Sequence, residues 1–275
     1  LFRSVAGWRR ARLPEGFVQE AFASLAPDWV CEVLSPSTES LDRGVKMAIY
    51  HREEVRHVWL VSPALKTLED DAARVAILRA GPGSKVWSAG HDIDELPEGG
   101  RDPLGWDDPL RHLVRTIETC RIPVIAAVNG PAVGLGCSLA ALSDVVYMAE
   151  SAFFADPHVS IGLVAADGGP LVWGSQISLL QAKEFALTGV RIKAERAVAL
   201  GLANHVVAEP LSEAIACAKK LVELPQQAVE ATKRLMNIQL EKSVMASLDY
   251  ANLAEYVSFG TADFNRIVDG LIAKK

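Results

Sequence analysis

Cysteine is scarce in this chain of 275 residues: four thiols occur, and no two of them are spaced as C-x-x-C. Their spacing suits no common zinc site, and no disulfide framework is expected from it. Isolated thiols in a chain of this size are typical of buried side chains in a reducing compartment. The sequence therefore predicts a cytoplasmic protein without a bound metal.

Long hydrophobic runs are also missing. The longest apolar stretch, residues 122–142, is interrupted by Asn129, Pro131 and several glycines, so it does not predict a membrane-spanning helix. Positive charge is in the minority, with 28 Lys and Arg against 34 Asp and Glu. This balance argues against nucleic acid as the main partner.

Several catalytic signatures are absent as well. The chain has no G-x-S-x-G elbow, no G-x-x-x-x-G-K-[ST] loop, no complete G-x-G-x-x-G and no H-E-x-x-H. These absences disfavour a serine hydrolase of the α/β type, a nucleotide-phosphate site and a zinc protease.

Half of the residues are hydrophobic, which is enough for a sizeable core. The first fourteen residues contain four arginines, and no acid precedes Glu15. This composition is typical of a solvated basic tail and also of the remnant of a transit peptide. Residues 1–44 are predicted to be an N-terminal extension, and residues 45–50 and 55–61 have the β-branched and aromatic content of strands.

Beyond Arg74 short apolar runs alternate with helical patterns. Residues 75–78, 123–128 and 144–149 predict buried strands, and residues 85–88 predict another. Helices are expected between them, and residues from about 211 onward are almost entirely helical by period. Strands that recur with helices between them indicate an α/β fold, with a helical C-terminal region over residues 208–275.

Four motifs in order resemble the crotonase (enoyl-CoA hydratase/isomerase) superfamily. They are KVWSAGHDI at residues 85–93, NGPAVGLGC at 129–137, FADPHVSIGL at 154–163 and LTGVRIKAERAVALGL at 187–202. The resemblance implies an α/β fold with a ββα spiral core over residues 45–207. It also implies a C-terminal region that builds homotrimers or hexamers, an acyl-CoA thioester as substrate, and no metal or redox cofactor.

The same resemblance assigns roles to the loop residues. It implies that the backbone N–H groups of His91 and Leu135 stabilise a thioester enolate, because two such donors lower the energy of the developing oxyanion. It also implies that substrate or coenzyme A is bound by Ala89, Gly90, Asp92, Gly134 and Ser138. The motif position of Asp92 is that of a residue that caps or braces its loop. Without the motifs, the glycines would indicate only a strand-to-helix turn, and Asp92 only an acid at the start of a helix.

The acid/base positions differ from those of the hydratases, which carry glutamates where this chain has Ser138 and His158. Histidine titrates near neutral pH, so His158 is predicted to carry the proton. Asp167 lies nine residues on and is predicted to fix its tautomer. The alternatives are a loop histidine bonded to the backbone, and an aspartate that caps the helix after Gly168 and Gly169.

Several functions remain open at this point. The first is a lyase or isomerase of the hydratase/isomerase family, acting in fatty acid metabolism. The pair His158 and Asp167 also resembles the crotonase-fold hydrolases that split β-diketones by retro-Claisen cleavage. Residues 88–93 resemble the decarboxylases of the superfamily that act on methylmalonyl-CoA. A catalytically impaired relative is a further alternative, because both hydratase glutamates are missing.

Overall fold

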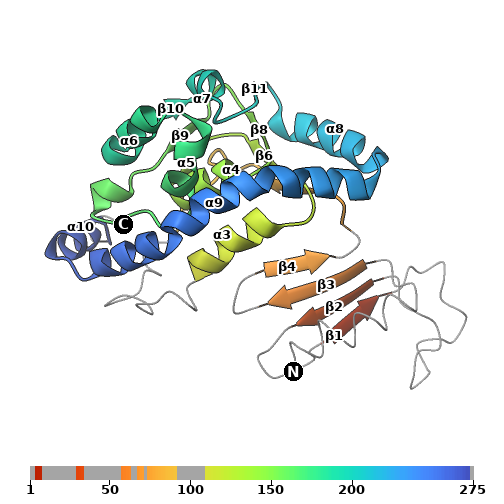
Figure 1. Cartoon of the computed structure of the whole chain (residues 1–275), viewed down its shortest axis with the longest axis horizontal. Helices are drawn as coiled ribbons and strands as arrows, with labels where there is room; N and C mark the ends of the chain where they lie inside the picture. The colour runs from red at the N-terminus through yellow and green to blue at the C-terminus, as the bar shows by residue number, and fades with distance from the viewer. Residues whose placement is uncertain are drawn as a thin grey trace, which may run out of the picture. The chain divides into compact units, whose positions relative to one another are not determined.

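The computed structural model describes residues 73–91 and 109–272 and, before them, four strands. The chain divides into two compact units, residues 1–73 and 74–275 (Figure 1). This division lies between Ala73 and Arg74, whereas the sequence analysis placed its boundaries at 44/45 and 207/208.

The first unit contains a four-stranded sheet of order β1-β2-β3-β4. Its strands are β1 (Ser4–Gly7), β2 (Trp29–Val33), β3 (His57–Ser62) and β4 (Thr67–Asp70). β2 and β3 are parallel, and the two outer pairs are antiparallel. The strand predicted around 55–61 corresponds to β3, whereas residues 45–50 lie outside the described residues.

The second unit is built on a parallel sheet of order β11-β8-β6-β5. Its strands are β5 (Ala76–Arg79), β6 (Val124–Val128), β8 (Val145–Met148) and β11 (His205–Val206). All five residues of β6 are buried, because a central strand of a parallel sheet is covered on both faces. The three strands predicted from apolar runs are therefore confirmed.

A smaller sheet of order β10-β9-β7 lies beside the glycine-rich turn. It consists of β7 (Ala132–Val133), β9 (Phe153–Ala155) and β10 (Ile192–Lys193). The strand predicted at residues 85–88 is wrong. Only an isolated bridge joins Ser88 to Ala132, because the backbone N–H groups of Trp87 and Ser88 both donate to the carbonyl of Pro131.

Helices connect and cover the two sheets of the second unit (Figure 1). The shorter ones are α3 (Pro109–Thr119), α4 (Leu135–Ala141), α5 (Gly169–Gln176), α6 (Leu179–Thr188) and α7 (Ala194–Leu200). The helical segment that follows Gly168 is divided into α5 and α6. The division arises because Ile177 is extended and the Ser178 side chain caps α6 by accepting the N–H of Gln181.

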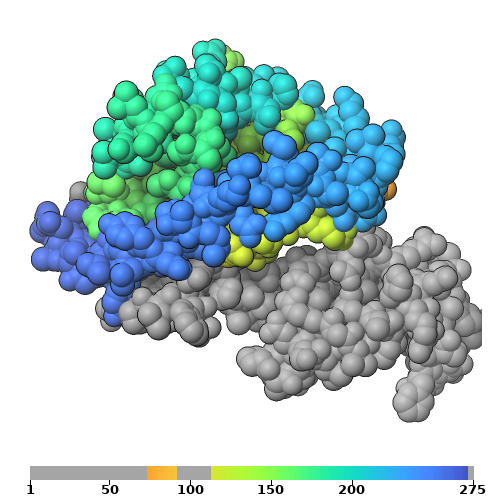
Figure 2. Space-filling view, viewed as in Figure 1, coloured from red at the N-terminus to blue at the C-terminus, as the bar shows by residue number. Residues whose placement is uncertain are grey.

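The C-terminal region is helical, as predicted. It comprises α8 (Pro210–Glu223), α9 (Gln226–Phe259) and α10 (Ala262–Ile272), and their outer surface runs across one face of the second unit (Figure 2). α9 packs against α3 and α5 through buried residues such as Val244 and Leu248. Lys233 of α9 forms an ion pair of 2.7 Å with Asp144, next to β8. α9 is thereby held along the core, and its C-terminal end reaches the candidate site.

Within the described residues, no helix is long and apolar enough to cross a membrane.

Candidate active site

Loops from three parts of the second unit surround a cavity of about 250 Å³. Its lining includes seven of the residues that the sequence analysis singled out: Ala89, Gly90, His91, Gly134, Leu135, His158 and Asp167. Ser138 is fully buried behind the cavity and does not line it, and Asp92 lies outside the described residues. The structure thus brings together residues that are up to 78 positions apart in the chain.

Two glycines allow the first two loops to approach each other. Gly90 has a φ of +96°, and a Cβ atom there would lie 3.0 Å from the carbonyl oxygen of Val133. Gly134 has a φ of +54°, and a Cβ atom there would lie 3.5 Å from Cε1 of His158. Both positions therefore favour glycine for their backbone conformation, and Gly90 also favours it for space.

Leu135 is the first residue of α4, directly after Gly134. Its backbone N–H therefore has no acceptor within the helix. The neighbouring N–H of Gly134 donates to Ala155 at 2.9 Å, which ties the turn to β9. As a result the start of α4 lies at the cavity wall, opposite the loop that carries His158.

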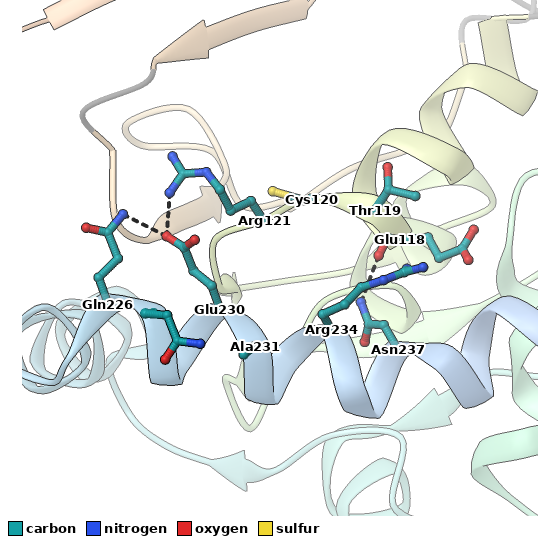
Figure 3. Close-up of a pocket in the computed structure, with 10 residues that line it drawn as sticks. Glu118, Thr119, Cys120, Arg121, Gln226, Glu230, Ala231, Arg234 and Asn237 are labelled. Atoms are coloured by element: carbon teal, nitrogen blue, oxygen red, sulfur yellow. Dashed lines mark hydrogen bonds and ion pairs between the residues drawn. The ribbon is translucent and has the colours of Figure 1, made fainter.

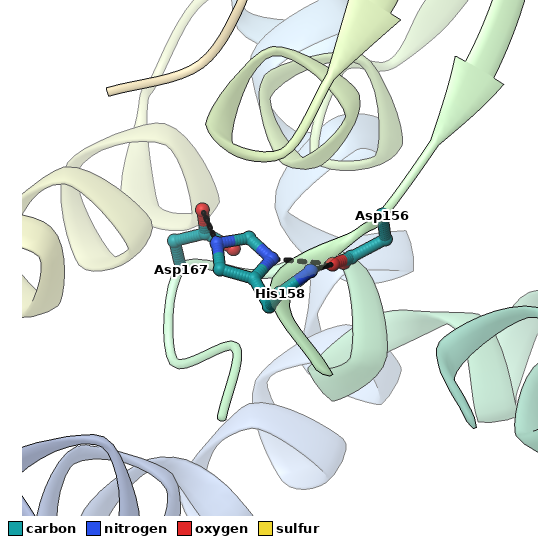
Figure 4. Close-up of side chains that lie close together, drawn as sticks. All are labelled: Asp156, His158 and Asp167. Carbon is teal, nitrogen blue, oxygen red and sulfur yellow. Dashed lines mark hydrogen bonds and ion pairs between the residues drawn. The ribbon is translucent and has the colours of Figure 1, made fainter. Parts of the chain in front are cut away.

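His158 begins the short 3₁₀ helix η5 (His158–Ile161), and its ring lies between two carboxylates (Figure 4). Nδ1 forms a short hydrogen bond with Oδ1 of Asp156. Nε2 lies 3.5 Å from Oδ2 of Asp167, an ion-pair distance rather than a tight hydrogen bond. The alternative of a loop histidine bonded only to the backbone is therefore wrong.

No role was predicted for Asp156 from the sequence. The sequence contained one indication of such a role, because Asp156 lies two residues before His158 within residues 154–158. A carboxylate that accepts the Nδ1–H of an imidazole fixes the ring tautomer and leaves Nε2 to face the cavity. This is the role that had been predicted for Asp167, which instead approaches the other ring nitrogen.

Asp167 is held by Ser138, which lies within α4 after the glycine-rich turn. The Ser138 hydroxyl donates to Oδ1 of Asp167 at 2.6 Å and accepts the N–H of Gly169 at 2.9 Å. The residue at the N-cap of α5 is Gly168, and no side chain caps that helix. The alternative role of Asp167 as a helix cap is therefore wrong, and Ser138 serves to orient the carboxylate.

Burial and charge act in opposite directions on His158. Burial lowers its pKa and is the largest single effect. The hydrogen bond to Asp156 and the charges of Asp167, Asp156 and Glu255 together outweigh it and raise the pKa to about 9. Burial also raises the pKa of Asp167, against the charge of His158 and the Ser138 hydrogen bond. At neutral pH His158 is therefore an imidazolium.

Glu255 of α9 is a further charged residue that the sequence analysis missed. It is 4% exposed and lines the cavity together with Phe259 of the same helix. In the sequence it is one acid among many on a long helical pattern, so nothing there distinguished it. Only the packing of α9 against the core brings it to the site.

The three residues Asp156, His158 and Asp167 have donor atoms within 4.8 Å of one another, as in some metal sites. However, both ring nitrogens of His158 already face a carboxylate. A histidine that contacts a carboxylate at each ring nitrogen can carry a proton, which is the role predicted for His158.

A second, more open groove of about 610 Å³ lies between the end of α3 and α9 (Figure 3). Its charged groups pair with one another: Arg121 contacts Glu230, and Gln226 donates to the same carboxylate at 2.7 Å. Glu118 is buried there, and burial raises its pKa. None of the predicted site residues lines this groove.

The second unit combines a parallel α/β core with a buried cluster of one histidine and two carboxylates near a glycine-rich turn. This combination is typical of an enzyme that uses acid/base chemistry. Residues 60–273 match the enoyl-CoA hydratase/isomerase family. The chain belongs to this family, and the resemblance to the crotonase superfamily is confirmed, as is the fold class.

Known relatives differ in their named activities. The chain is 41% identical over 144 residues to methylmalonyl-CoA decarboxylase of Escherichia coli, a match that covers 52% of this chain and about half, 55%, of that protein. It is 32% identical over 217 residues to mitochondrial enoyl-CoA hydratase of Pongo abelii, covering 78% of this chain and 74% of that one.

Solved structures agree with this assignment. An enoyl-CoA hydratase/isomerase from Mycobacterium paratuberculosis is 51% identical, with a TM-score of 0.68, over 88% of this chain and 94% of that one. A methylmalonyl-CoA decarboxylase in complex with 2-nitronate-propionyl-CoA is 25% identical, with a TM-score of 0.66, over 90% of this chain and 93% of that one.

The N-terminal unit has a separate similarity. Residues 3–81 match a family described as putative restriction endonucleases. This match overlaps the hydratase/isomerase match at residues 60–81 and was not anticipated from the sequence. It concerns the unit that carries β1 to β4, and none of the cavity-lining residues lies within it.

Proposed function

We propose that this enzyme binds an acyl-CoA thioester and stabilises its enolate with the backbone N–H groups of His91 and Leu135, while His158 supplies a proton. The observation that carries the proposal is that both of these loop residues line the same cavity as His158. The named substrates of the relatives, an enoyl-CoA and methylmalonyl-CoA, support a thioester ligand.

The enolate step relies on fixed backbone donors. Charge that develops on a thioester oxygen is stabilised most by donors that are already in place, and loss of one typically costs about 10²–10³ in rate. The N–H of Leu135 meets this requirement, because the first turn of α4 leaves it without a helical acceptor. Ala89, Gly90 and Gly134 would then line the path of the thioester.

The proton step relies on His158. As an imidazolium it can deliver the Nε2 proton to the enolate carbon: the N–H bond breaks, and the electron pair of the enolate forms the new C–H bond. Asp156 holds the ring in place through Nδ1. Asp167, oriented by Ser138, stabilises the charged ring until the proton leaves. A lyase or isomerase reaction is proposed on this basis.

Coenzyme A enters as part of the substrate, and we propose no metal or redox cofactor. A homotrimer or hexamer is proposed as well. Large apolar side chains on the outer surfaces of α6 and α9, such as Leu180 and Tyr250, support burial against another copy.

Titration calorimetry of the full chain with crotonyl-CoA, acetyl-CoA and free coenzyme A tests the proposal. We expect both thioesters to bind more tightly than free coenzyme A, because only they place an oxygen between the two N–H donors. Absence of binding to all three ligands would refute the acyl-CoA function.

A second function, cleavage of a β-diketone without coenzyme A, is favoured by the contact between His158 and Asp167. In that reaction one carbonyl takes up water, the C–C bond to the neighbouring carbon breaks, its electron pair moves into the enolate, and His158 protonates the carbon. Release of a carboxylic acid from a cyclic β-diketone, together with no thioester binding, would support this function over the first.

A further inference from the structure

One part of the cavity wall belongs to a small hydrophobic cluster of its own. Ile161, Leu163 and Phe259 line the cavity. The same three residues pack together with Phe264 and Val268 of α10, in a cluster that is distinct from the main core. The two C-terminal helices α9 and α10 therefore help to form an apolar part of the candidate active site.

The short helix η5 leads from the proton carrier to this cluster. His158 is its first residue and Ile161 its last, and both line the cavity. In a 3₁₀ helix the side chains of residues three apart lie on the same face, and three residues advance about 6 Å. An extended backbone advances roughly 3.3–3.6 Å for the three bonds of each residue, so an alkyl chain spans this length with about five bonds. A short alkyl group on a carbon beside His158 thus reaches Ile161.

The ring of Phe259 is packed firmly behind the cavity wall. Phe259 is 4% exposed, and its ring meets that of Phe264 edge to face, with 5.3 Å between the ring centroids. Phe264 lies against Gly162 at the end of η5, where an added Cβ atom would be 3.1 Å from the Cα atom of Phe264. Because packed interiors contain few voids, the Phe259 ring can move back only if α10 also moves.

Hydrogen bonds fix the same end of α9 to the loop that carries His158. The backbone N–H of Val164 donates to the hydroxyl of Ser258, directly before Phe259, at 3.3 Å. The N–H of Leu163 donates to the carbonyl of His158 at 2.9 Å. The position of Phe259 relative to His158 is therefore set by contacts on both sides.

The size of the cavity agrees with a small acyl group. Its volume of about 250 Å³ lies below the roughly 300–1,000 Å³ that is usual for small-molecule sites. An alkyl group gains affinity for every methylene that it buries, but only where there is space for it. A longer chain would have to displace Phe259 or turn back into water, and it would then gain nothing from its added length.

We propose that Phe259 limits the length of the acyl group, so that the enzyme acts on thioesters of short-chain apolar acids. This inference rests on the proposed acyl-CoA function and names the class of acyl group that the site accepts.

Butyryl-CoA and octanoyl-CoA are a suitable pair of probes, since they differ only in the length of an unbranched alkyl chain. In an open apolar pocket each further buried methylene would strengthen binding about fourfold. Titration of the unaltered full chain should instead show octanoyl-CoA bound no more tightly than butyryl-CoA. Tighter binding of octanoyl-CoA would overturn the inference and leave the proposed function intact. Failure of both thioesters and of crotonyl-CoA to bind would refute the proposed function itself.

Phe259→Leu then tests the residue. The smaller side chain should raise the affinity for octanoyl-CoA relative to butyryl-CoA by about tenfold, because it gives space to one or two further methylenes. Phe185→Leu is the matched control: Phe185 is also buried, but it packs against Trp173 and does not line the cavity, so the ratio should stay as in the parent. An unchanged ratio in a folded Phe259→Leu protein would overturn the inference. If that variant does not fold, the two thioesters on the unaltered protein still decide it.

Discussion

The hydroxyl of Ser138 donates to the carboxylate of Asp167 at 2.6 Å, which joins α4 to the loop that precedes α5. Both residues are buried, and the same hydroxyl accepts the N–H of Gly169. The Ser138 side chain therefore provides a hydrogen-bond partner for a buried carboxylate and for a buried backbone amide. It also orients the carboxylate of Asp167 toward His158.

Ser138→Ala should destabilise the second unit by about 1–3 kcal/mol, because it leaves two buried polar groups without their partner. It should also raise the pKa of Asp167 further, since the lost hydrogen bond stabilised the charged form. Urea unfolding followed by the helical circular-dichroism signal measures the change. Ser143→Ala is the control: its hydroxyl bonds only to the carbonyl of Leu139, and a loss within about 0.5 kcal/mol is expected. Equal losses in the two variants would contradict the role of Ser138.

His158→Ala should lower turnover of an acyl-CoA substrate by about 10²–10⁴, the usual contribution of a positioned acid. Thioester affinity should change little, because the backbone donors remain. His205→Ala removes a histidine that stacks on Tyr147 away from the cavity, and should leave turnover as in the parent. Turnover that survives in the His158 variant would exclude His158 as the proton carrier.

The stability of the second unit should fall as the pH rises from about 6.5 to above 9. The pKa of His158 is about 9 in the folded chain, above the value near 6.5 expected in the unfolded chain. Its charged form therefore contributes stability that is fully present below pH 6.5 and lost as the pH passes 9. The raised pKa of Asp167 acts with the same sign at lower pH.

The contribution of His158 corresponds to about 3 kcal/mol across this pH range. The measurement compares unfolding free energies of the parent and His158→Asn at several pH values. The parent should lose its advantage between pH 6.5 and above 9, while the variant stays nearly flat. Parallel curves would show that His158 is not held as an imidazolium.

Gly134→Ala should abolish most turnover, because the φ of 54° and ψ of −122° at this residue are rarely adopted by a residue with a Cβ atom, so the turn that carries the Leu135 N–H must shift. Gly83→Ala is a matched control, since Gly83 also has a positive φ of 77° but has nothing within 4 Å of the added Cβ. Both variants should lose about 1–3 kcal/mol of stability from backbone strain. Steady-state kinetics separates them: only Gly134→Ala should lose activity, and a similar loss in both would contradict a specific role for Gly134.

The sequence predicted the central strands well because a buried parallel strand reads as an unbroken apolar run. It failed at residues 85–88, where the apolar character of Val86 and Trp87 suggested a strand. There the N–H groups of Trp87 and Ser88 share the carbonyl of Pro131, a pairing that depends on a loop more than forty residues away.

The residues of the candidate site show the same difference between signals that are local in the sequence and contacts between distant segments. His91, Leu135 and His158 were found because the short motifs that contain them resemble those of the crotonase superfamily. Asp156 was missed although it is two residues from His158, since an acid near a histidine is common in sequences. Glu255 could not be found, because a single acid on a helix of 34 residues gives no periodic signal.

The sequence by itself determined the family, the parallel α/β core, the helical C-terminal region and the loops that meet at the cavity. The core and the helices follow from apolar periodicity, and the family and the loops follow from short motifs that resemble those of the crotonase superfamily. All of these signals extend over only a few residues. Only the tertiary structure decided which carboxylate takes which nitrogen of His158, and that Glu255 joins them from α9. Electrostatic interactions depend on distance in space and on burial, and neither is encoded in the spacing of residues along the chain.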